Sequence, residues 1–296
     1  MLDWAEWVAG GTRVKLALPG GATHALFCRV EGAGPWLTLL HGFPTCSWDW
    51  AAISPTLATR YRTLSLDFLG YGDSDKPRPH RYSVFEQADL VEALWRQQGI
   101  GQTHLVAHDF GDSVATELLA RQAEGRLGAT ITQTVLLNGG VYVDAYHPLL
   151  IQTLLRRPVI GPLIARLVTE RRFARSLRAI FSPAHPISDA DLRQHWQAIQ
   201  RRDGARIYHA LIRYIDERYA QRARWEGALA RCPTPLHAIW GMVDPVSGAD
   251  VAARLGERAP GVDLLTLPDV GHYPQIEVPG VVAAAIVRML DVPPAR

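Results

Sequence analysis

Three residues that can carry out nucleophilic catalysis each lie just beyond a short apolar segment typical of a buried strand. They are Asp109, Asp244 and His272, in that order along the chain. An ionised carboxylate is a nucleophile, and a histidine oriented by a second carboxylate can take a proton from water. A nucleophile, an acid and a histidine at the ends of three separate strands predict a catalytic triad.

The segment around Asp109 indicates how the nucleophile is presented. Residues 105–107 are typical of a buried strand, 109–111 of a tight turn, and 113–122 of a helix. A strand, a sharp turn and a helix form a nucleophile elbow, written G-x-S-x-G when the nucleophile is serine. Asp109 takes the place of that serine, and Ala107 takes the place of the first glycine. We therefore interpret Asp109 as a carboxylate nucleophile.

A carboxylate nucleophile restricts the reaction. In-line attack on an sp³ carbon gives an ester on the enzyme and releases a halide or an epoxide alkoxide. Attack on an acyl group would give a labile anhydride instead, which argues against an esterase, a lipase or a lactonase. In the second step His272, oriented by Asp244, would activate the water that hydrolyses the ester. The backbone amides of Phe43 and Phe110 are placed like an oxyanion hole for that step.

The elements around these residues alternate strands with helices. Strands are expected at 36–40, 61–66, 105–107, 133–137, 236–240 and 262–267, after a hairpin of 14–18 and 25–30. Helices are expected at 47–58, 84–98, 113–122, 249–257 and 280–290. This alternation predicts an α/β fold with a mostly parallel central sheet and helices on both faces.

Residues 141–229 interrupt the alternation. The segment is rich in arginine, divided by prolines and free of strand patterns, with helices expected at 172–181, 189–200 and 207–219. It is too long for a loop. We therefore predict a core domain made of residues 1–140 and 230–296, with a helical cap inserted at 141–229.

The composition is that of an ordinary globular protein, with 296 residues, 48% of them hydrophobic, and a net charge of +2. Interspersed charges do not indicate a nucleic-acid partner, and neither the three cysteines nor the histidines show metal-ligand spacing. No apolar run approaches the roughly 18 residues of a membrane span, and the N-terminus does not resemble a signal peptide. We expect a cytoplasmic monomer or homodimer with a small-molecule substrate, and no cofactor, metal, nucleic-acid or membrane partner.

Four motifs add a family resemblance. They are His41-Gly-Phe-Pro44, Asp67-x-x-Gly-x-Gly-x-Ser-Asp75, His108-Asp-x-Gly111 and Gly271-His272. Together they resemble the aspartate-nucleophile branch of the α/β-hydrolase family, which includes epoxide hydrolases and haloalkane dehalogenases. More narrowly, the stretches Asp75–Gln87, His108–Ser113, Asn138–Gly140 and His272–Gln275 resemble the mesoderm-specific transcript proteins, and this similarity extends from about Leu40 onward. The resemblance implies an α/β-hydrolase fold with an inserted helical cap.

Within that branch, the resemblance favours an epoxide over a haloalkane. The related dehalogenases hold the halide with a Trp after the nucleophile, paired with an Asn or a second Trp, where this chain has Phe110 and Phe43. Epoxide hydrolases open the ring with tyrosines of the cap. Tyr214 lies where one of these tyrosines is expected, and Tyr142 and Tyr146 are candidates for the other.

The sequence therefore predicts an epoxide hydrolase that forms a vicinal diol, with Trp48, Tyr142 and Tyr146 as candidate substrate-binding residues. Trp48 fits the core equally well. Two alternatives stay open: a haloalkane dehalogenase with an atypical halide site, and a catalytically idle fold that serves as a binding protein. The presence of all three triad residues argues against the idle fold.

Overall fold

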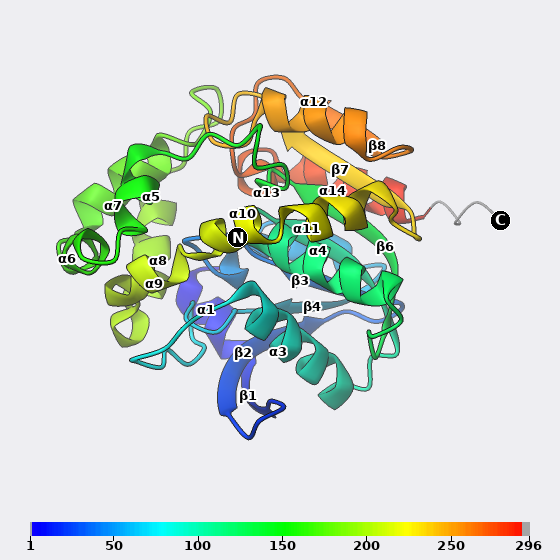
Figure 1. Cartoon of the computed structure of the whole chain (residues 1–296), viewed down its shortest axis with the longest axis horizontal. Helices are drawn as coiled ribbons and strands as arrows, with labels where there is room; N and C mark the ends of the chain where they lie inside the picture. Colours follow the sequence, from blue (N-terminus) through cyan, green and yellow to red (C-terminus); the bar gives the residue numbers. More distant parts are fainter. Residues whose placement is uncertain (1, 292–296) are drawn as a thin grey trace.

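The described part of the chain is built around an eight-stranded sheet (Figure 1). The structure, a computed structural model, describes residues 2–291. The strand order is β1-β2-β4-β3-β5-β6-β7-β8; the β1–β2 and β2–β4 pairs are antiparallel and the other pairs are parallel. The strands are β1 (Thr12–Ala17), β2 (Thr23–Glu31), β3 (Trp36–Leu40), β4 (Arg62–Leu66), β5 (Gln102–His108), β6 (Thr130–Leu137), β7 (Leu236–Gly241) and β8 (Asp263–Leu267). The predicted mostly parallel sheet is confirmed.

Helices cover both faces of the sheet because apolar side chains alternate along its strands. Leu105 and Ala107 of β5 lie in one apolar cluster, whereas Val106 between them lies in the other. The first cluster includes side chains of α3 (Val84–Gln97), α4 (Phe110–Ala123), α11 (Arg222–Ala230) and α12 (Ala249–Arg258). The second includes side chains of α1 (Trp4–Ala9), the 3₁₀ helix η1 (Ser47–Trp50), α2 (Ser54–Leu57) and α14 (Pro279–Leu290).

The N-terminal helices differ from the prediction. The single helix expected at 47–58 is divided into η1 and α2, because Pro55 lacks an N–H and its ring clashes with a continuous helix before it. Helix α1 was not expected. It begins where the Asp3 side chain accepts a hydrogen bond from the Glu6 amide.

A run of short helices fills the chain between β6 and β7. They are α5 (Leu150–Leu155), α6 (Ile160–Arg166), α7 (Glu170–Arg178), α8 (Asp189–Gln200), η2 (Arg201–Ile207), α9 (Tyr208–Leu211), α10 (Tyr214–Ala220) and α11. Residues 150–230 are called the helical segment below. Helices α5 to α9 project to one side of the sheet, on the left of Figure 1. The helix expected at 207–219 is broken into α9 and α10, whereas α8 has the predicted bounds and its predicted Ser188 cap.

Helix α13 (Pro274–Glu277) is a further short element that follows β8 and leads into α14. It was not expected from the sequence, because a single helical turn carries too few residues to show a period. Among residues 2–291, no helix combines the length and the hydropathy that crossing a membrane requires.

Candidate active site

Asp109 occupies the sharp turn between β5 and α4. Its backbone angles, φ 46° and ψ −102°, lie in a region that a non-glycine residue adopts only under constraint, at a cost on the order of 1–3 kcal/mol. Gly111 makes the turn possible, because a Cβ atom there would lie 2.3 Å from the carbonyl oxygen of Leu40. The side chain of Asp109 is buried. This is the local geometry of a nucleophile elbow.

The loop after β3 supplies a backbone donor to the Asp109 carboxylate. The Phe43 amide donates to Asp109 Oδ2 at 3.1 Å. Phe110 is the first residue of α4, so its amide belongs to the free N–H groups at the helix start. His41 braces the loop by donating from Nδ1 to the Gly42 carbonyl oxygen at 2.8 Å. Burial lowers the pKa of His41 to about 3, so this imidazole is neutral.

Asp244 and His272 meet at the ends of β7 and β8. His272 Nδ1 lies 2.7 Å from Asp244 Oδ2. The same oxygen accepts from Asn138 Nδ2 at 3.0 Å and Ser247 Oγ at 2.9 Å, and Oδ1 accepts from the Val246 amide at 2.8 Å. Burial would raise the pKa of Asp244, but the ion pair with His272 and these donors hold it below its usual range. Asp244 is therefore a fixed, ionised partner for the imidazole.

The charge of His272 depends mainly on two carboxylates. Burial lowers the pKa of this imidazole, but Asp244 and the nearby Asp109 outweigh burial and raise it to about 9. The backbone on either side is fixed too: the His272 amide donates to the Ile180 carbonyl oxygen at 2.9 Å, and His108 Nε2 donates to the His272 carbonyl oxygen at 2.7 Å. With both carboxylates ionised, His272 carries its proton at neutral pH.

Glu277 anchors the loop that carries His272. Its carboxylate accepts from the amides of Gly271 at 2.8 Å, Tyr273 at 3.0 Å and Ser182 at 3.0 Å. The last of these bonds joins the loop to the helical segment. Sequence analysis did not identify Glu277, because an acid in a short helical turn is common. Two of its donors come from the adjoining loop, and the third, Ser182, lies 95 residues away.

Arg218 of α10 reaches Asp109, and it too was missed from the sequence. Its Nη2 donates to the Asp109 carbonyl oxygen at 2.8 Å and lies 3.4 Å from Asp109 Oδ1, and its Nε donates to Ser113 Oγ at 2.7 Å. The guanidinium is only 3% exposed and lies over the Tyr214 ring, 4.7 Å from its centroid. Arg218 thus gives the Asp109 carboxylate a buried counter-ion from the helical segment. One arginine among many in that segment offered no signal in the sequence.

Asp112, one turn beyond the nucleophile, is a second buried acid. Neither of its carboxylate oxygens has a hydrogen-bond partner within residues 2–291. Burial and the charge of Asp109 raise its pKa well above the usual range, and Arg218 opposes them only in part. Burial thus disfavours the ionised form of Asp112, whereas Asp109 has direct contact with the Arg218 guanidinium.

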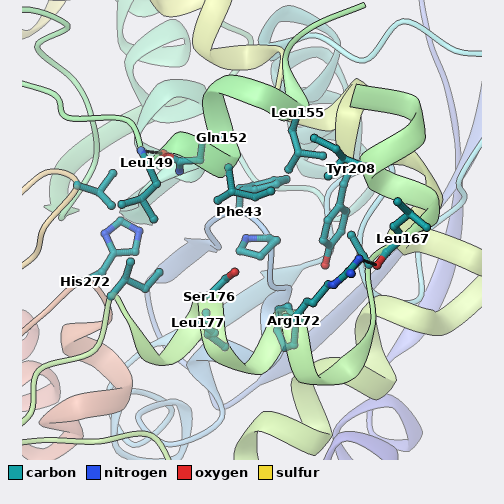
Figure 2. A pocket seen from close by; sticks show the side chains of 17 residues that line it. Phe43, Leu149, Gln152, Leu155, Leu167, Arg172, Ser176, Leu177, Tyr208 and His272 are labelled. Carbon is teal, nitrogen blue, oxygen red and sulfur yellow. Dashed lines mark hydrogen bonds between the residues drawn. The ribbon is translucent and has the colours of Figure 1, made fainter. Parts of the chain in front are cut away.

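A cavity of about 360 Å³ opens beside His272 (Figure 2). Most of its wall consists of apolar side chains of residues 149–180, with Phe43 from the loop after β3 and Tyr208 from α9. The Tyr208 hydroxyl is buried and has no hydrogen-bond partner in the described chain, and sequence analysis did not identify it. Asp109 is not among the residues that line the cavity, but its carboxylate accepts a hydrogen bond from the amide of Phe43, which does line it.

Tyr214 packs beside the nucleophile. Its ring centroid lies 4.8 Å from that of Phe110 and 6.0 Å from that of Phe43. Its hydroxyl is buried and finds no hydrogen-bond partner among the described residues. Burial raises the pKa of Tyr214 well above the usual range, so the hydroxyl is a neutral donor. The structure thus places Tyr214 next to both residues whose amides surround Asp109.

The three predicted substrate-binding residues lie outside the lining of this cavity. The Tyr146 hydroxyl donates to Gln152 Oε1 at 3.2 Å, and its ring lies under the Arg218 guanidinium. Tyr142 is fully buried, with the guanidinium of Arg258 5.6 Å from its ring centroid. Trp48 is in the apolar cluster behind the sheet and donates its indole N–H to a backbone carbonyl near the N-terminus. In this structure Trp48 and Tyr142 are core residues, because the chain packs them against the sheet.

One group of described residues has the arrangement of a metal site. The ligand atoms of His24, His80 and Glu86 lie within 4.8 Å of one another. His80 Nε2 is already 2.8 Å from a Glu86 carboxylate oxygen. None of the three belongs to the candidate active site.

The fold and the site together define the class of protein. Residues 35–279 match the alpha/beta hydrolase fold family, and the chain belongs to this family. It is 43% identical over 286 residues to the LipZ protein of Mycobacterium tuberculosis, which is named as a hydrolase, covering 96% of this chain and 97% of that protein. It is 42% identical over 257 residues to the human mesoderm-specific transcript homolog protein, covering 84% and 77%. The predicted family and this closer resemblance are confirmed.

More distant matches extend the comparison. Haloalkane dehalogenase 2 of Mycobacterium bovis is 26% identical over 266 residues, covering 87% of this chain and 88% of that protein. The solved structure of Cfl2 from Burkholderia cenocepacia superposes with a TM-score of 0.78 at 25% identity, covering 94% and 95%. This protein is therefore a hydrolase of the α/β-hydrolase family with dehalogenase-like relatives.

Proposed function

We propose that this hydrolase converts an epoxide and water into a vicinal diol through an ester on Asp109. One observation carries the proposal: a buried carboxylate at a strained elbow lies near an Asp244–His272 pair at the same edge of the parallel sheet. The influence of Asp109 on the pKa of His272 supports their proximity. A carboxylate in this position is suited to attack an sp³ carbon, and a histidine beside it is suited to hydrolyse the resulting ester.

In the first step a carboxylate oxygen of Asp109 attacks a ring carbon of the epoxide. The bond from that carbon to the ring oxygen breaks, its electron pair goes to the oxygen, and a tyrosine hydroxyl protonates the oxygen. Tyr214 is the proposed donor, because its neutral hydroxyl is buried without a partner in the described chain and its ring packs on Phe110. Tyr208 is a second proposed donor, since its hydroxyl is equally unpaired and its side chain lines the cavity.

In the second step His272 becomes a base. The ester on Asp109 is uncharged, so its formation removes one of the carboxylates that raise the pKa of His272. The imidazole then passes its proton through solvent to the tyrosinate left by the first step, and as a neutral base takes a proton from the water that attacks the ester carbonyl carbon. The amides of Phe43 and Phe110 would stabilise the tetrahedral oxyanion by on the order of 3 kcal/mol per donor. Collapse breaks the ester bond, and the leaving oxygen takes the hydrogen of the new carboxyl group. This releases the diol, returns Asp109 to a carboxylate and leaves His272 protonated as in the resting protein.

Arg218 is proposed to position the nucleophile. It holds the Asp109 carbonyl oxygen and Oδ1, while the Phe43 amide holds Oδ2, so the carboxylate has fixed contacts on both oxygens. A carboxylate held in this way loses little rotational freedom on reaching the attacking geometry. The ion pair also reduces the negative charge available for attack, so positioning must outweigh that loss.

An epoxide fits the surroundings of Asp109 better than a haloalkane does. A halide leaving group needs N–H donors that face the attacked carbon, and Phe43 and Phe110 have no side-chain donor. No tryptophan lines the described cavity. A haloalkane dehalogenase stays the second candidate, because one such enzyme is among the relatives of this chain.

We also propose that residues 141–229 act as a cap on a core domain of residues 1–140 and 230–296. Side chains of α5, α6 and α7 form most of the cavity wall opposite His272, and Arg218 extends from α10 to the nucleophile. The segment therefore closes the site from the side that faces away from the sheet, which would exclude water until substrate binds.

The experiment that tests this function is trapping of the ester. His272→Gln should still form the ester from a terminal epoxide but hydrolyse it slowly, so the intact mass should rise by the mass of the epoxide, with the adduct located on Asp109. Wild-type protein should form diol from the same epoxide. Protein that binds the epoxide and stays unmodified in the variant would exclude Asp109 as the nucleophile.

The same assay separates the alternatives. A dehalogenase should release chloride or bromide from 1-halohexanes faster than it forms diol from 1,2-epoxyhexane. An idle fold used for binding should do neither, and neither substrate should leave a mass on His272→Gln. The matched control is His147→Gln, an exposed histidine whose side chain pairs with Asp250 and is not part of the cavity lining, and it should turn over like the wild type.

A further inference from the structure

The outer end of the helical segment exposes an unusual amount of apolar surface. Of the nine large hydrophobic side chains that are exposed in the described chain, six lie within residues 150–167. They are Leu150, Ile151, Val159, Ile160, Leu163 and Leu167. Exposed residues of this kind are ordinary when scattered, but a contiguous group of them marks an interaction surface.

These side chains belong to neighbouring helices. Ile160, Leu163 and Leu167 recur at the spacing of one helix face, along and just beyond α6. Leu150 and Ile151 lie at the start of α5. Helix α6 packs closely on α5, and Figure 1 shows both at the edge of the molecule farthest from β8 and α12. We call the six side chains the apolar surface.

Positive charge borders the apolar surface. Residues 150–178 contain seven arginines and one acidic residue, Glu170. Arg157 lies between α5 and α6, and Arg166 lies in the last turn of α6; both are exposed and have no ion-pair partner within residues 2–291. Arg172 donates to the Leu167 carbonyl oxygen at 2.7 Å, which fixes a third guanidinium at the edge of this surface.

The apolar surface is continuous with the cavity beside His272. Ile151 and Leu167 belong to both, since they line the cavity and are 37% and 59% exposed. In Figure 2, Leu167 and Arg172 lie across the cavity from His272. A molecule that enters beside Leu167 would therefore travel along apolar side chains until it reached the imidazole.

We propose that the apolar surface docks on an anionic lipid membrane and admits lipophilic substrate from the bilayer to the cavity. Leucine, isoleucine and valine side chains enter the acyl boundary, and arginines around them pair with anionic headgroups; this is how a protein lies on a membrane without spanning it. Docking goes beyond the epoxide chemistry and does not depend on it. It departs from our expectation of no membrane partner, which rested on the absence of a spanning run.

A second copy of this chain fits the surface less well. In a symmetric dimer the same patch meets itself, so Arg157, Arg166 and Arg172 of both copies would gather in one interface, where residues 150–178 of each copy offer a single acid, Glu170. Like charges brought together in an interface are unfavourable, whereas anionic lipid neutralises them. A dimer would also cover the entrance between Ile151 and Leu167.

Flotation with vesicles tests the proposal directly. The whole protein is mixed with phosphatidylcholine vesicles, or with vesicles in which about a third of the lipid is phosphatidylglycerol, at low salt. Partitioning of wild-type protein should be at least tenfold stronger on the anionic vesicles, because each arginine near such a surface contributes roughly fivefold. It should weaken as salt is added.

Two matched pairs of variants separate the apolar and the charged contributions. Val159→Ser/Leu163→Ser should weaken partitioning at least tenfold, because each methylene buried in lipid contributes about fourfold, whereas exposed Val281→Ser on α14 should not. Arg157→Glu/Arg166→Glu should weaken it at least tenfold, whereas Arg96→Glu/Arg231→Glu, with the same change in net charge at other exposed arginines, should not. Circular dichroism and Tm check that each variant is folded.

Three results would overturn the proposal. They are equal partitioning of wild-type protein on neutral and anionic vesicles, equal partitioning of Val159→Ser/Leu163→Ser and wild type, and a wild-type dimer in light scattering that this double variant dissociates. The last result would assign the surface to a second copy of the chain. Loss of diol formation with vesicle binding intact would count against the proposed reaction alone.

Discussion

Polar and apolar groups are arranged in opposite ways at the candidate active site, which lies at the strand ends, and at the outer end of the helical segment. Around Asp244 every carboxylate contact is a fixed hydrogen bond inside the protein, and the residues are buried. Around Leu163 large apolar side chains face outward and neighbouring arginines have no ion-pair partner in the described chain. The first arrangement is preorganised for chemistry, because its groups need not reorganise. The second is incomplete without an external partner.

Arg218 joins the two regions. It belongs to the helical segment, yet its guanidinium is one of the most buried charges in the molecule and is hydrogen bonded to the elbow. The comparison therefore predicts a gradient of effects. Changes at the strand ends should abolish turnover, changes at the junction should affect both turnover and folding, and changes on the apolar surface should affect access only.

The largest effect is expected at the nucleophile. Asp109→Asn keeps the shape of the side chain but removes the attacking charge, so turnover of a terminal epoxide should fall by roughly 10⁵-fold. Asp112→Asn is the matched control, because the Asp112 carboxylate is buried without a hydrogen-bond partner in the described chain, so turnover should change less than tenfold. Initial rates of diol formation measure both. Equal losses in the two variants would contradict the assignment of the nucleophile.

The next largest effect is expected at Asp244. Asp244→Asn removes the charge that orients and stabilises the His272 imidazolium, so hydrolysis of the ester should slow by roughly 10³- to 10⁴-fold. Because ester formation does not need that charge, the adduct on Asp109 should accumulate during turnover. Rapid-quench mass spectrometry would show this accumulation. A slow reaction without any adduct would place the role of Asp244 in the first step instead.

These two residues and His272 were found from the sequence for a physical reason. Each lies next to the short apolar run that forms its strand, and strand ends of a parallel sheet converge, so local patterns place all three together. Arg218, Glu277 and Tyr208 could not be found that way. The partners of Arg218, Ser113 and Asp109, lie far away in the chain, and nothing local distinguishes it from the exposed arginines around it. Glu277 and Tyr208 belong to no local pattern that marks a site residue.

The fold was predictable to a similar degree. Strands such as β3 and β7 came from apolar runs that the buried sheet requires, and helix α8 came from its Ser188 cap. The short helices could not be predicted one by one from the sequence. A helix of four to seven residues shows less than two turns of its period, so α5, α6, α9 and α10 depend on tertiary packing that no local pattern reports.

Substitutions of Arg218 test the contact between the helical segment and the nucleophile elbow. Arg218→Met leaves the Asp109 carboxylate buried without its counter-ion, which should destabilise the protein by about 3–5 kcal/mol. Arg218→Lys keeps the charge but cannot reach Ser113 and the Asp109 carbonyl oxygen together, so it should keep most of the stability and still lose turnover. Chemical denaturation and kcat measure the two effects. Full turnover in Arg218→Lys would show that charge alone is needed, and would exclude the positioning role.

Smaller effects are expected from the tyrosines. Tyr214→Phe should lower the rate of ester formation from an epoxide by roughly 10- to 100-fold, since one general acid contributes on that order. Tyr208→Phe should lower it less, because Tyr208 lies on the cavity wall and not against Phe110. Single-turnover kinetics with His272→Gln as the background isolates this step. A larger effect of Tyr208→Phe would make Tyr208 the main proton donor to the epoxide oxygen and Tyr214 the secondary one.

The smallest effect is expected in the pH dependence of the free energy of unfolding. This dependence distinguishes the buried site from the exposed surface. The pKa of His272 is about 9 in the folded protein and about 6.5 in an unfolded chain. A raised pKa stabilises the fold fully below pH 6.5, and this stabilisation is lost as the pH rises through 9. The wild type should therefore lose about 1–3 kcal/mol between pH 6.5 and 9, or several degrees in Tm, relative to His272→Gln. Exposed His147→Gln should follow the wild type.

A wild-type curve of stability against pH that runs parallel to that of His272→Gln would contradict this prediction. It would mean that Asp244 and Asp109 do not hold the proton on His272 in the resting protein, and that the imidazole is a base before the ester forms.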